Sequence, residues 1–167
     1  MKVYHGSVAT VKEPLVHVGR PHLDFGQGFY VTDLEEQAIS WAARPFNAGK
    51  TPILNVYEFD KEQAISSGYK LLQFERYNSE WLDFIVANRR GERLWEGYDM
   101  VEGGVANDDV FNTLELYLSE LIPKEVALKR LQYEKPNNQI CILNQAVIDR
   151  YLHFVEAVVI RKEDGNG

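Results

Sequence analysis

Apolar and polar residues alternate in several short runs along the chain, and this period of two is typical of half-buried β-strands. The clearest run is 53–59, in which Ile53, Tyr57 and Phe59 share one face of the expected strand. Shorter runs predict further strands at 2–5, 29–32, 69–74, 98–101, 140–143 and 154–160. Val16 and Val18 also alternate with a polar residue, so 16–18 is expected to be a strand or an extended segment. The pattern therefore predicts about seven short strands.

Between these runs, apolar residues recur at the spacing of a helix, after polar residues suited to helix capping. Asp33, with Glu36 three residues later, resembles a capping box and is expected to open a helix that carries Trp41 on its apolar face. Asn78 or Ser79 is expected to cap the next helix. Three more helices are predicted from Asp108 or Asp109 to Leu118, from Pro123 at the first position to near Tyr133, and from Gln145 to Tyr151.

Strands and helices do not follow one another in regular alternation, so the expected fold class is α+β, with a mostly antiparallel or split β-sheet. The composition, 45% hydrophobic and 26% charged, is that of a globular protein. A length of 167 residues without a repeat or a linker indicates one domain. We expect this domain to span residues 1–161 and the polar end, 162–167, to form a flexible tail.

Charge and cysteine content exclude several classes of protein. The 25 acidic and 18 basic residues give a net charge of −7, which argues against a general polyanion-binding surface but leaves room for a local basic pocket. Cys141 is the only cysteine, so no internal disulfide framework exists, and no histidine–carboxylate cluster predicts a metal site. Because the sequence shows no long apolar run and no signal-peptide core, the protein is expected to be cytoplasmic, with no membrane partner.

Three segments hold residues suited to ligand binding. Tyr4-His5-Gly6-Ser7 ends a predicted strand and offers a histidine and open backbone beside a glycine, although a structural histidine at a strand edge fits as well. Segment 24–32 places two glycines directly before an aromatic strand and is either a ring-binding loop or a plain loop-to-strand junction. Asn137-Asn138-Gln139 offers uncharged donors and acceptors or is simply a turn. A basic cluster at 89–93 complements a helix dipole or contacts a phosphate.

Taken together and in this order, the segments resemble the ADP-ribosyltransferase superfamily and, more narrowly, the bacterial DUF3990 family. The most specific block is 24–32, followed by Gln37-Ala38 and Trp41-Ala42. The other pieces of the resemblance span nearly the whole chain and are Tyr4-His5-Gly6-Ser7, Arg20, Leu23, 56–60, 81–85, Asn88-Arg89, Tyr98-Asp99, Val105-Ala106 and 139–142.

The resemblance implies an ADP-ribosyltransferase-like split β-sheet with inserted helices and a central cleft that binds NAD as a co-substrate, without a metal. It implies catalytic roles for His5, Tyr30 and Gln139, in which His5 orients the ribose of the nicotinamide half and Tyr30 stacks on the nicotinamide ring. NAD-binding roles are implied for Gly6, Ser7, Arg20, Gly28, Phe29, Thr32 and Trp41. In this set the Gly6 backbone would bind the nicotinamide amide, Trp41 would close the other ring face, and Arg20 either pairs with the pyrophosphate or is an ordinary surface arginine.

Two positions depart from the family pattern. Gln139 stands where many relatives carry a glutamate, so its amide can accept a bond from the ribose hydroxyl but supplies no negative charge to the transition state. A carboxylate from elsewhere, Asp24 or Glu102, would have to compensate. Ala38 stands where a small hydroxyl residue often binds the nicotinamide amide.

The resemblance implies a mono-ADP-ribosyltransferase that transfers ADP-ribose from NAD to a macromolecular acceptor, either protein or nucleic acid. Such families commonly act as toxins in bacterial toxin–antitoxin or phage-defence loci, which implies an antitoxin protein as a partner. Two alternatives stay open. One is a catalytically weak NAD-binding module, motivated by Gln139 and Ala38, and the other is an NAD glycohydrolase in which water is the acceptor.

Overall fold

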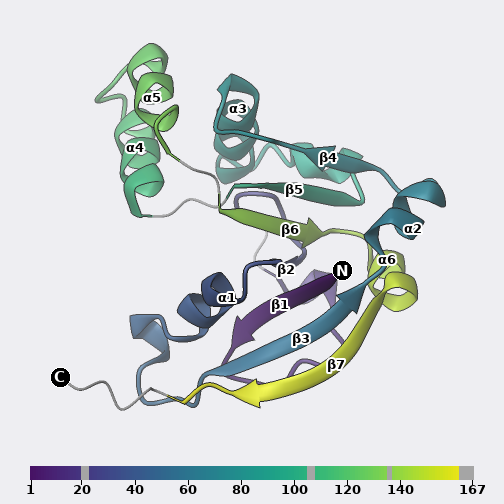
Figure 1. Cartoon of the computed structure of the whole chain (residues 1–167). Coiled ribbons are helices and arrows are strands. Elements are labelled where there is room, and N and C mark those ends of the chain that lie inside the picture. Colours follow the sequence, from purple (N-terminus) through teal and green to yellow (C-terminus); the bar gives the residue numbers. More distant parts are fainter. Residues whose placement is uncertain (20–22, 105–107, 135–136, 162–167) are drawn as a thin grey trace.

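The chain folds into two β-sheets with helices inserted between the strands, as the computed structural model shows for residues 1–19, 23–104, 108–134 and 137–161 (Figure 1). The expected tail, 162–167, lies outside these described residues. One sheet has three strands, in the order β1 (Lys2–Ser7), β3 (Ile53–Phe59) and β7 (Leu152–Val159). The other has four, in the order β2 (Phe29–Val31), β6 (Asn138–Ile142), β5 (Met100–Gly104) and β4 (Leu71–Gln73).

Strand pairing is antiparallel throughout both sheets except between β4 and β5, which run parallel. The two sheets meet where Tyr4 and Thr32 exchange backbone hydrogen bonds of 2.8 and 3.0 Å. The α+β class is therefore confirmed, with mostly antiparallel strands divided between two sheets. The bridge at Tyr4 also places the middle of β1 beside the end of β2, and both strands carry predicted site residues.

The helices lie in two groups around the sheets. In Figure 1, α3 (Ser79–Arg89), α4 (Asp108–Leu118) and α5 (Lys124–Leu131) lie together beyond the four-stranded sheet. Helix α1 (Glu35–Ala42) packs against the three-stranded sheet, and α2 (Lys61–Ser66) and α6 (Gln145–Tyr151) lie near the opposite ends of its strands. Short 3₁₀ turns are η1 (Val16–Val18), η2 (Pro45–Asn47) and η3 (Leu94–Gly97). No helix in the described ranges is both long and apolar enough to cross a bilayer.

Several local predictions need correction. Residues 16–18 form a 3₁₀ turn rather than a strand, because Val16 donates its N–H to the Gln145 side chain and accepts from Gly19, leaving no ladder partner. Helix α1 begins after Leu34 and has no side-chain cap at its N-cap residue, so Asp33 is not its cap. Asn78 does cap α3, since its side chain accepts from the Trp81 N–H at 3.0 Å.

One further helix start and one whole helix differ from the sequence expectation. Pro123 is the N-cap of α5 and not its first helical residue. Helix α2 has no counterpart among the predictions, because its six residues are too few to show a helical period.

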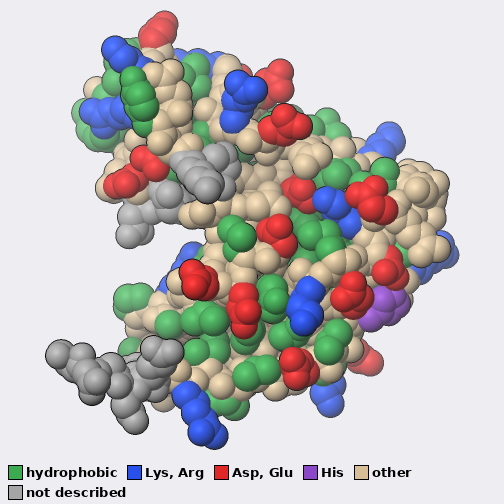
Figure 2. Space-filling view, in the orientation of Figure 1, with side chains coloured by type: hydrophobic (Ala, Val, Ile, Leu, Met, Phe, Trp, Pro, Cys, Tyr) green, Lys and Arg blue, Asp and Glu red, His purple; other side chains and the backbone are tan. Residues whose placement is uncertain are grey.

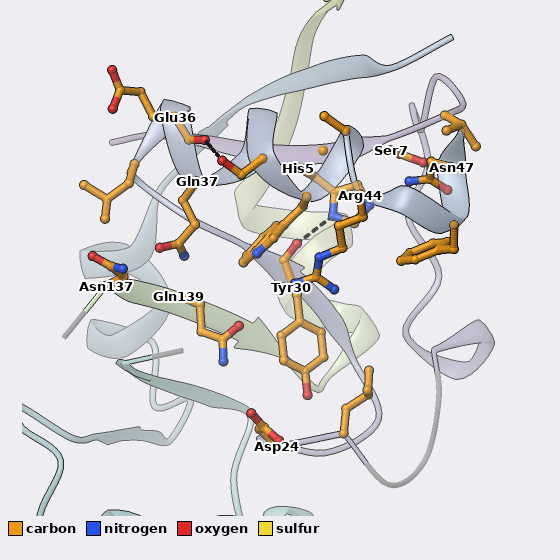
Figure 3. Close-up of a pocket in the computed structure, with 18 of the residues that line it drawn as sticks. His5, Ser7, Asp24, Tyr30, Glu36, Gln37, Arg44, Asn47, Asn137 and Gln139 are labelled. Carbon is orange, nitrogen blue, oxygen red and sulfur yellow. Dashed lines mark hydrogen bonds between the residues drawn. The ribbon is translucent and has the colours of Figure 1, made fainter. Parts of the chain in front are cut away.

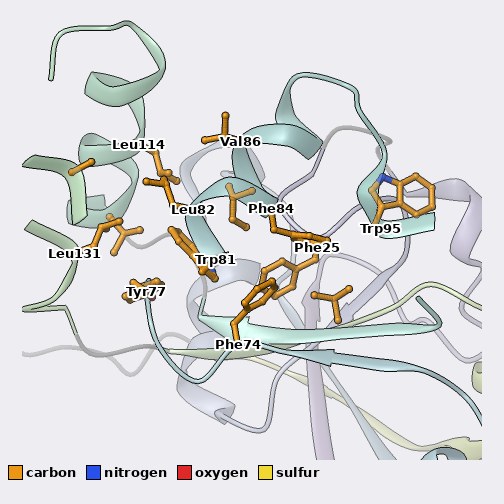
Figure 4. Packing of buried hydrophobic residues seen from close by; sticks show 14 of the residues in the cluster. Phe25, Phe74, Tyr77, Trp81, Leu82, Phe84, Val86, Trp95, Leu114 and Leu131 are labelled. Atoms are coloured by element: carbon orange, nitrogen blue, oxygen red, sulfur yellow. The ribbon is translucent and has the colours of Figure 1, made fainter. Parts of the chain in front are cut away.

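Buried aromatic residues fasten the loop that leads into β2. Phe25 is fully buried, with its ring centroid 6.3 Å from that of Phe74 and 6.4 Å from that of Phe84 (Figure 4). Gly26, at φ +106°, lies directly under the Trp95 ring, where an added Cβ would come within 2.2 Å of a ring carbon. A side chain larger than hydrogen does not fit there. The packing of Phe25 and Gly26 therefore fixes the loop before β2, and with it the position of Tyr30.

Candidate functional site

A cleft with a volume of about 1390 Å³ runs between the part of the molecule that carries α1 and the part that carries α3 and α4. Figure 2 shows the molecule hollowed on this side. Residues from β1, β2, α1, η2, β6, α3 and α4 form its wall, so the cleft draws on both sheets. A cleft of this size exceeds the roughly 300–1,000 Å³ of most ligand pockets.

Six of the predicted site residues come together in this cleft although they are far apart in the sequence. They are His5, Gly6, Ser7, Tyr30, Trp41 and Gln139. Three others lie behind the wall: Gly28 packs against Cys141 and Ile142, the Phe29 ring lies 4.4 Å from the His5 ring, and Thr32 is fully buried. Arg20 lies outside the described residues.

The imidazole of His5 has one nitrogen fixed by the backbone, and its burial favours the neutral form. Its Nδ1 lies 2.7 Å from the carbonyl oxygen of Tyr30, and because a carbonyl only accepts, Nδ1 must carry the hydrogen. Burial lowers the pKa of His5 from its ordinary value, which outweighs the opposite effect of this hydrogen bond. The Nε2 atom is therefore an acceptor, suited to a ligand hydroxyl.

Gly6 brings β1 and α1 into direct backbone contact. An added Cβ on Gly6 would lie 1.8 Å from the carbonyl oxygen of Ala38 and 3.0 Å from the N atom of Ala42. Ala38 is consequently buried in this contact and does not line the cleft. The close approach is what places Trp41, on the same helix, next to the end of β1 in the wall of the cleft.

Tyr30 contributes its ring, since its hydroxyl is already engaged. The hydroxyl donates to the carbonyl oxygen of Gly26 at 2.6 Å and accepts from the N–H of Phe25 at 3.2 Å. Burial raises the pKa of Tyr30 well above its ordinary value, so the phenol stays protonated. The hydrogen bonds of the hydroxyl with residues 25 and 26 hold the Tyr30 ring at the wall of the cleft (Figure 3).

Gln139 lies on β6 with 5% of its surface exposed, and its side chain makes no hydrogen bond to any described residue. In Figure 3 its amide points into the space beside Tyr30, above Asp24. An uncommitted amide at the wall of a cleft is free to bind a ligand.

Only one of the two candidate compensating carboxylates reaches the cleft. Asp24 lines it, with Oδ1 2.8 Å from both Nε and Nη2 of Arg89. Glu102 is paired in register with Ile140, one residue after Gln139, and neighbouring strand residues face opposite sides of a sheet. It is bound instead by Lys61 Nζ at 2.9 Å and by Gln73 Nε2 at 3.1 Å.

The cleft also contains residues that the sequence did not single out. Arg44 lies just after α1, lines the cleft, and forms no ion pair with any residue that the structure describes. Phe46 is 70% exposed at the rim, and Phe111 lies on α4 with the Arg89 guanidinium 5.4 Å from its ring centroid. Arg89 belonged to the predicted basic cluster, but nothing local in the sequence marks Arg44, Phe46 or Phe111, because the tertiary fold alone brings them to the cleft.

The family model for DUF3990, described as a protein of unknown function, matches residues 1–154. The chain belongs to the DUF3990 family. This confirms the narrower part of the resemblance, whereas membership of the ADP-ribosyltransferase superfamily stays a prediction. None of the curated proteins and none of the solved structures compared with the DUF3990 protein matches it.

The DUF3990 cleft offers a definite set of chemical groups. Two aromatic residues can hold a flat ring, the His5 Nε2 and the Gln139 amide can bind hydroxyl groups, and Arg44 can pair with an anion. Within the described parts of the chain, no cluster of three or more histidine, cysteine or carboxylate side chains could hold a metal ion. The set fits a large ligand that carries an aromatic ring, hydroxyl groups and negative charge.

Proposed function

We propose that the DUF3990 protein binds NAD in this cleft and transfers ADP-ribose to a macromolecular acceptor. The observation that supports the proposal most is the convergence of His5, Gly6, Tyr30, Trp41 and Gln139 on one cleft. The resemblance implies a role at an NAD site for each of these residues on sequence alone. These residues come from four different elements, and residues with unrelated structural roles would not be expected to meet in one cleft.

In this proposal the nicotinamide ring lies between Tyr30 and Trp41, and the adjoining ribose hydroxyls face the His5 Nε2 and the Gln139 amide. The bond between C1′ and the nicotinamide nitrogen breaks, and its electron pair leaves with the ring, which becomes neutral nicotinamide. The ribose is left as an oxocarbenium ion. A nucleophilic atom of the acceptor then bonds to C1′ and releases its proton, so ADP-ribose is transferred without a metal or a redox step.

Arg44 is the residue we assign to the pyrophosphate of NAD. The guanidinium group suits bidentate contacts with phosphate, and Arg44 is exposed in the cleft without an acidic partner among the described residues. Arg89, in contrast, is engaged by Asp24. Replacing Arg44 with alanine should raise the dissociation constant for NAD by about tenfold, as expected for a lost charge-assisted contact. Arg130→Ala, on α5 outside the cleft, is the matched control and should bind as the wild type does.

The neutral Gln139 favours a second candidate function, a catalytically weak NAD-binding module. A carboxylate accepts hydrogen bonds roughly twice as strongly as an amide and stabilises a developing cation. Asp24 is the carboxylate that lies below Gln139 in Figure 3 and could replace the missing negative charge, yet its own charge is balanced by Arg89. The same cleft would also serve an NAD glycohydrolase, which differs only in using water as the acceptor.

The three activities are separated by one experiment with NAD labelled in its adenylate half. Label on a macromolecule from a bacterial lysate supports the transferase, free ADP-ribose alone supports the glycohydrolase, and binding without nicotinamide release supports the module. Activity or binding should be lost in His5→Ala and Tyr30→Ala but kept in His153→Ala and Tyr133→Ala, which change exposed residues outside the cleft. A protein that neither binds NAD nor releases nicotinamide would refute the proposal.

The proposed activity also predicts the biological role of the protein. A transferase of this kind would act as a toxin, kept inactive by an antitoxin protein. Growth arrest on expression of the wild-type protein, absent for His5→Ala, would support this setting. Normal growth at equal protein levels would argue against it.

A further inference from the structure

The carbonyl oxygen of Asn138, directly before Gln139, accepts hydrogen bonds from two side chains. Thr32 Oγ1 donates to it at 2.7 Å and Gln37 Nε2 donates at 2.9 Å. The direction of both bonds follows from chemistry, because a carbonyl oxygen can only accept. The Thr32 hydroxyl oxygen also accepts from the Leu34 N–H at 3.1 Å, so it links the start of α1 to the start of β6.

These two side chains take the place of a missing strand partner. The pairing of β2 with β6 ends at Val31 and Ile140, so Asn138 and Gln139 lie past the last paired residues on that side. On the other side, Gly103 and Gly104 of β5 still pair with them. The Thr32 and Gln37 side chains therefore complete the support of the β6 backbone where the β2 ladder stops.

Thr32 connects three strands that carry site residues. Its backbone exchanges hydrogen bonds of 2.8 and 3.0 Å with Tyr4, the neighbour of His5 on β1. Its side chain holds Asn138, the neighbour of Gln139 on β6, and it follows Tyr30 by two residues. Thr32 is fully buried and does not line the cleft, so it has no surface for direct contact with a ligand.

The Gln37 side chain leaves one of its polar atoms without a hydrogen bond to the described residues in this arrangement. With Nε2 turned to Asn138, its Oε1 is buried without a hydrogen-bond partner among the described residues. A buried acceptor without a partner costs free energy, and the hydrogen bonds that Nε2 donates to Asn138 at 2.9 Å and to Thr32 Oγ1 at 3.3 Å offset that cost. Gln139 itself makes no side-chain hydrogen bond to the described part of the chain, so its position depends on the backbone that Gln37 and Thr32 hold.

We propose that Thr32 and Gln37 are positioning residues that hold Gln139 at the reacting ribose through the Asn138 carbonyl. This inference rests on the proposed NAD chemistry for its kinetic consequence. Thr32 does not line the cleft, and Gln37 lines it but has its Nε2 engaged by the Asn138 carbonyl, so neither is assigned a hydrogen bond to NAD. Their loss changes where the Gln139 amide lies when nicotinamide departs, which lowers kcat more than it raises KM.

The kinetic test uses Thr32→Val, which keeps the shape but removes the hydroxyl, and Gln37→Leu. Each should lower kcat for nicotinamide release about tenfold or more, because small misplacements of a catalytic group are costly, with KM changed less than about twofold. Thr32→Ser keeps the hydroxyl and should restore the rate. Thr113→Val on α4 and Gln63→Leu on α2 are matched controls outside the cleft.

A double-mutant comparison decides whether the two residues act through Gln139. In a Gln139→Ala background, Thr32→Val and Gln37→Leu should lower kcat no further. An additional loss equal to that seen with Gln139 present would overturn the proposal. Failure of Thr32→Ser to recover the rate would overturn the assignment to the hydroxyl.

A second measurement needs no NAD and separates failure of this inference from failure of the proposed function. Backbone amide exchange at residues 138–140 should be faster in Thr32→Val and Gln37→Leu than in the wild type, with exchange in β3 unchanged. Unchanged exchange at 138–140 would refute the positioning role even if the protein turns over NAD. Faster exchange in a protein that never uses NAD would uphold the support of β6 and refute only the catalytic consequence.

Discussion

Replacing Gly6 with alanine tests the contact on which the geometry of the cleft depends. The new Cβ would start 1.8 Å from the Ala38 carbonyl oxygen and 2.8 Å from the Ala38 carbonyl carbon. An ordinary contact needs at least 3.4 Å, and the obstructing atoms are backbone atoms that no rotamer change can remove. The whole of α1 would therefore have to move away from β1.

The expected loss of stability can be sized from this overlap. Overpacking a well-packed contact costs about 1–3 kcal/mol, and the rigid backbone neighbours place Gly6→Ala near the upper end. For a chain of this size a loss of about 3 kcal/mol lowers Tm by roughly 6–12 °C. NAD binding should weaken too, because the displaced helix carries Trp41 away from the strand that carries His5.

Thermal unfolding followed by circular dichroism gives the stability change, and titration calorimetry with NAD gives the affinity. Gly97→Ala is the matched control, since an added Cβ at Gly97 meets nothing within 4 Å. If the Tm of Gly6→Ala lay within about 2 °C of the Tm of Gly97→Ala, α1 would not pack on β1 as closely as described. A stable Gly6→Ala protein that bound NAD normally would also refute the link between this contact and the cleft.

Three further predictions concern single residues. Gln139→Glu should raise the rate of nicotinamide release about tenfold, which corresponds to the difference between a neutral and a charge-assisted hydrogen bond. An unchanged rate would mean that residue 139 does not face the developing positive charge. Because burial lowers the pKa of His5 below 6.5, the unfolded chain gains a proton there before the folded chain does. His5 should therefore make the free energy of urea unfolding fall as the pH drops from 7 to 5, with a contribution of at most about 1.4 kcal/mol per pH unit that His5→Gln should remove. Cys141 is fully buried with a raised pKa, so it should resist alkylation in the folded protein and react fully in urea; rapid labelling without urea would contradict its burial.

Local patterns in the sequence predict most of the elements and fail where the signal is short. Strand β3 and helix α6 were predicted with the boundaries that the structure shows, since 53–59 alternates clearly and 145–151 lies between well-marked ends. Residues 16–18 form a 3₁₀ turn where the sequence predicts a strand or an extended segment, because three residues fit both equally well. The pairing of strands into two sheets depends on contacts between distant segments, which no local period specifies.

The candidate site divides in the same way. The ordered motifs predict roles for His5, Tyr30 and Gln139 through a resemblance that spans the chain, and the structure brings these three residues to one cleft. The resemblance implies that Thr32 binds NAD, and in the structure its side chain forms hydrogen bonds with Leu34, Gln37 and Asn138. Motif position gives the neighbourhood of such a residue, whereas only the tertiary contacts show whether its side chain meets the ligand or supports a residue that does.

NAD, the proposed substrate, is an anion, and a protein with a net charge of −7 can bind it only where its basic groups are locally exposed. Arg89 and Asp24 neutralise each other, which leaves Glu35 and Glu36 in the first turn of α1 and Arg44 just beyond its last turn. The cleft is therefore negative at one end of α1 and positive at the other. In NAD the nicotinamide ring is cationic and the pyrophosphate anionic, so this polarity favours the pyrophosphate at the Arg44 end. The uneven charge along the cleft would then add to the contact that Arg44 is proposed to make with the pyrophosphate.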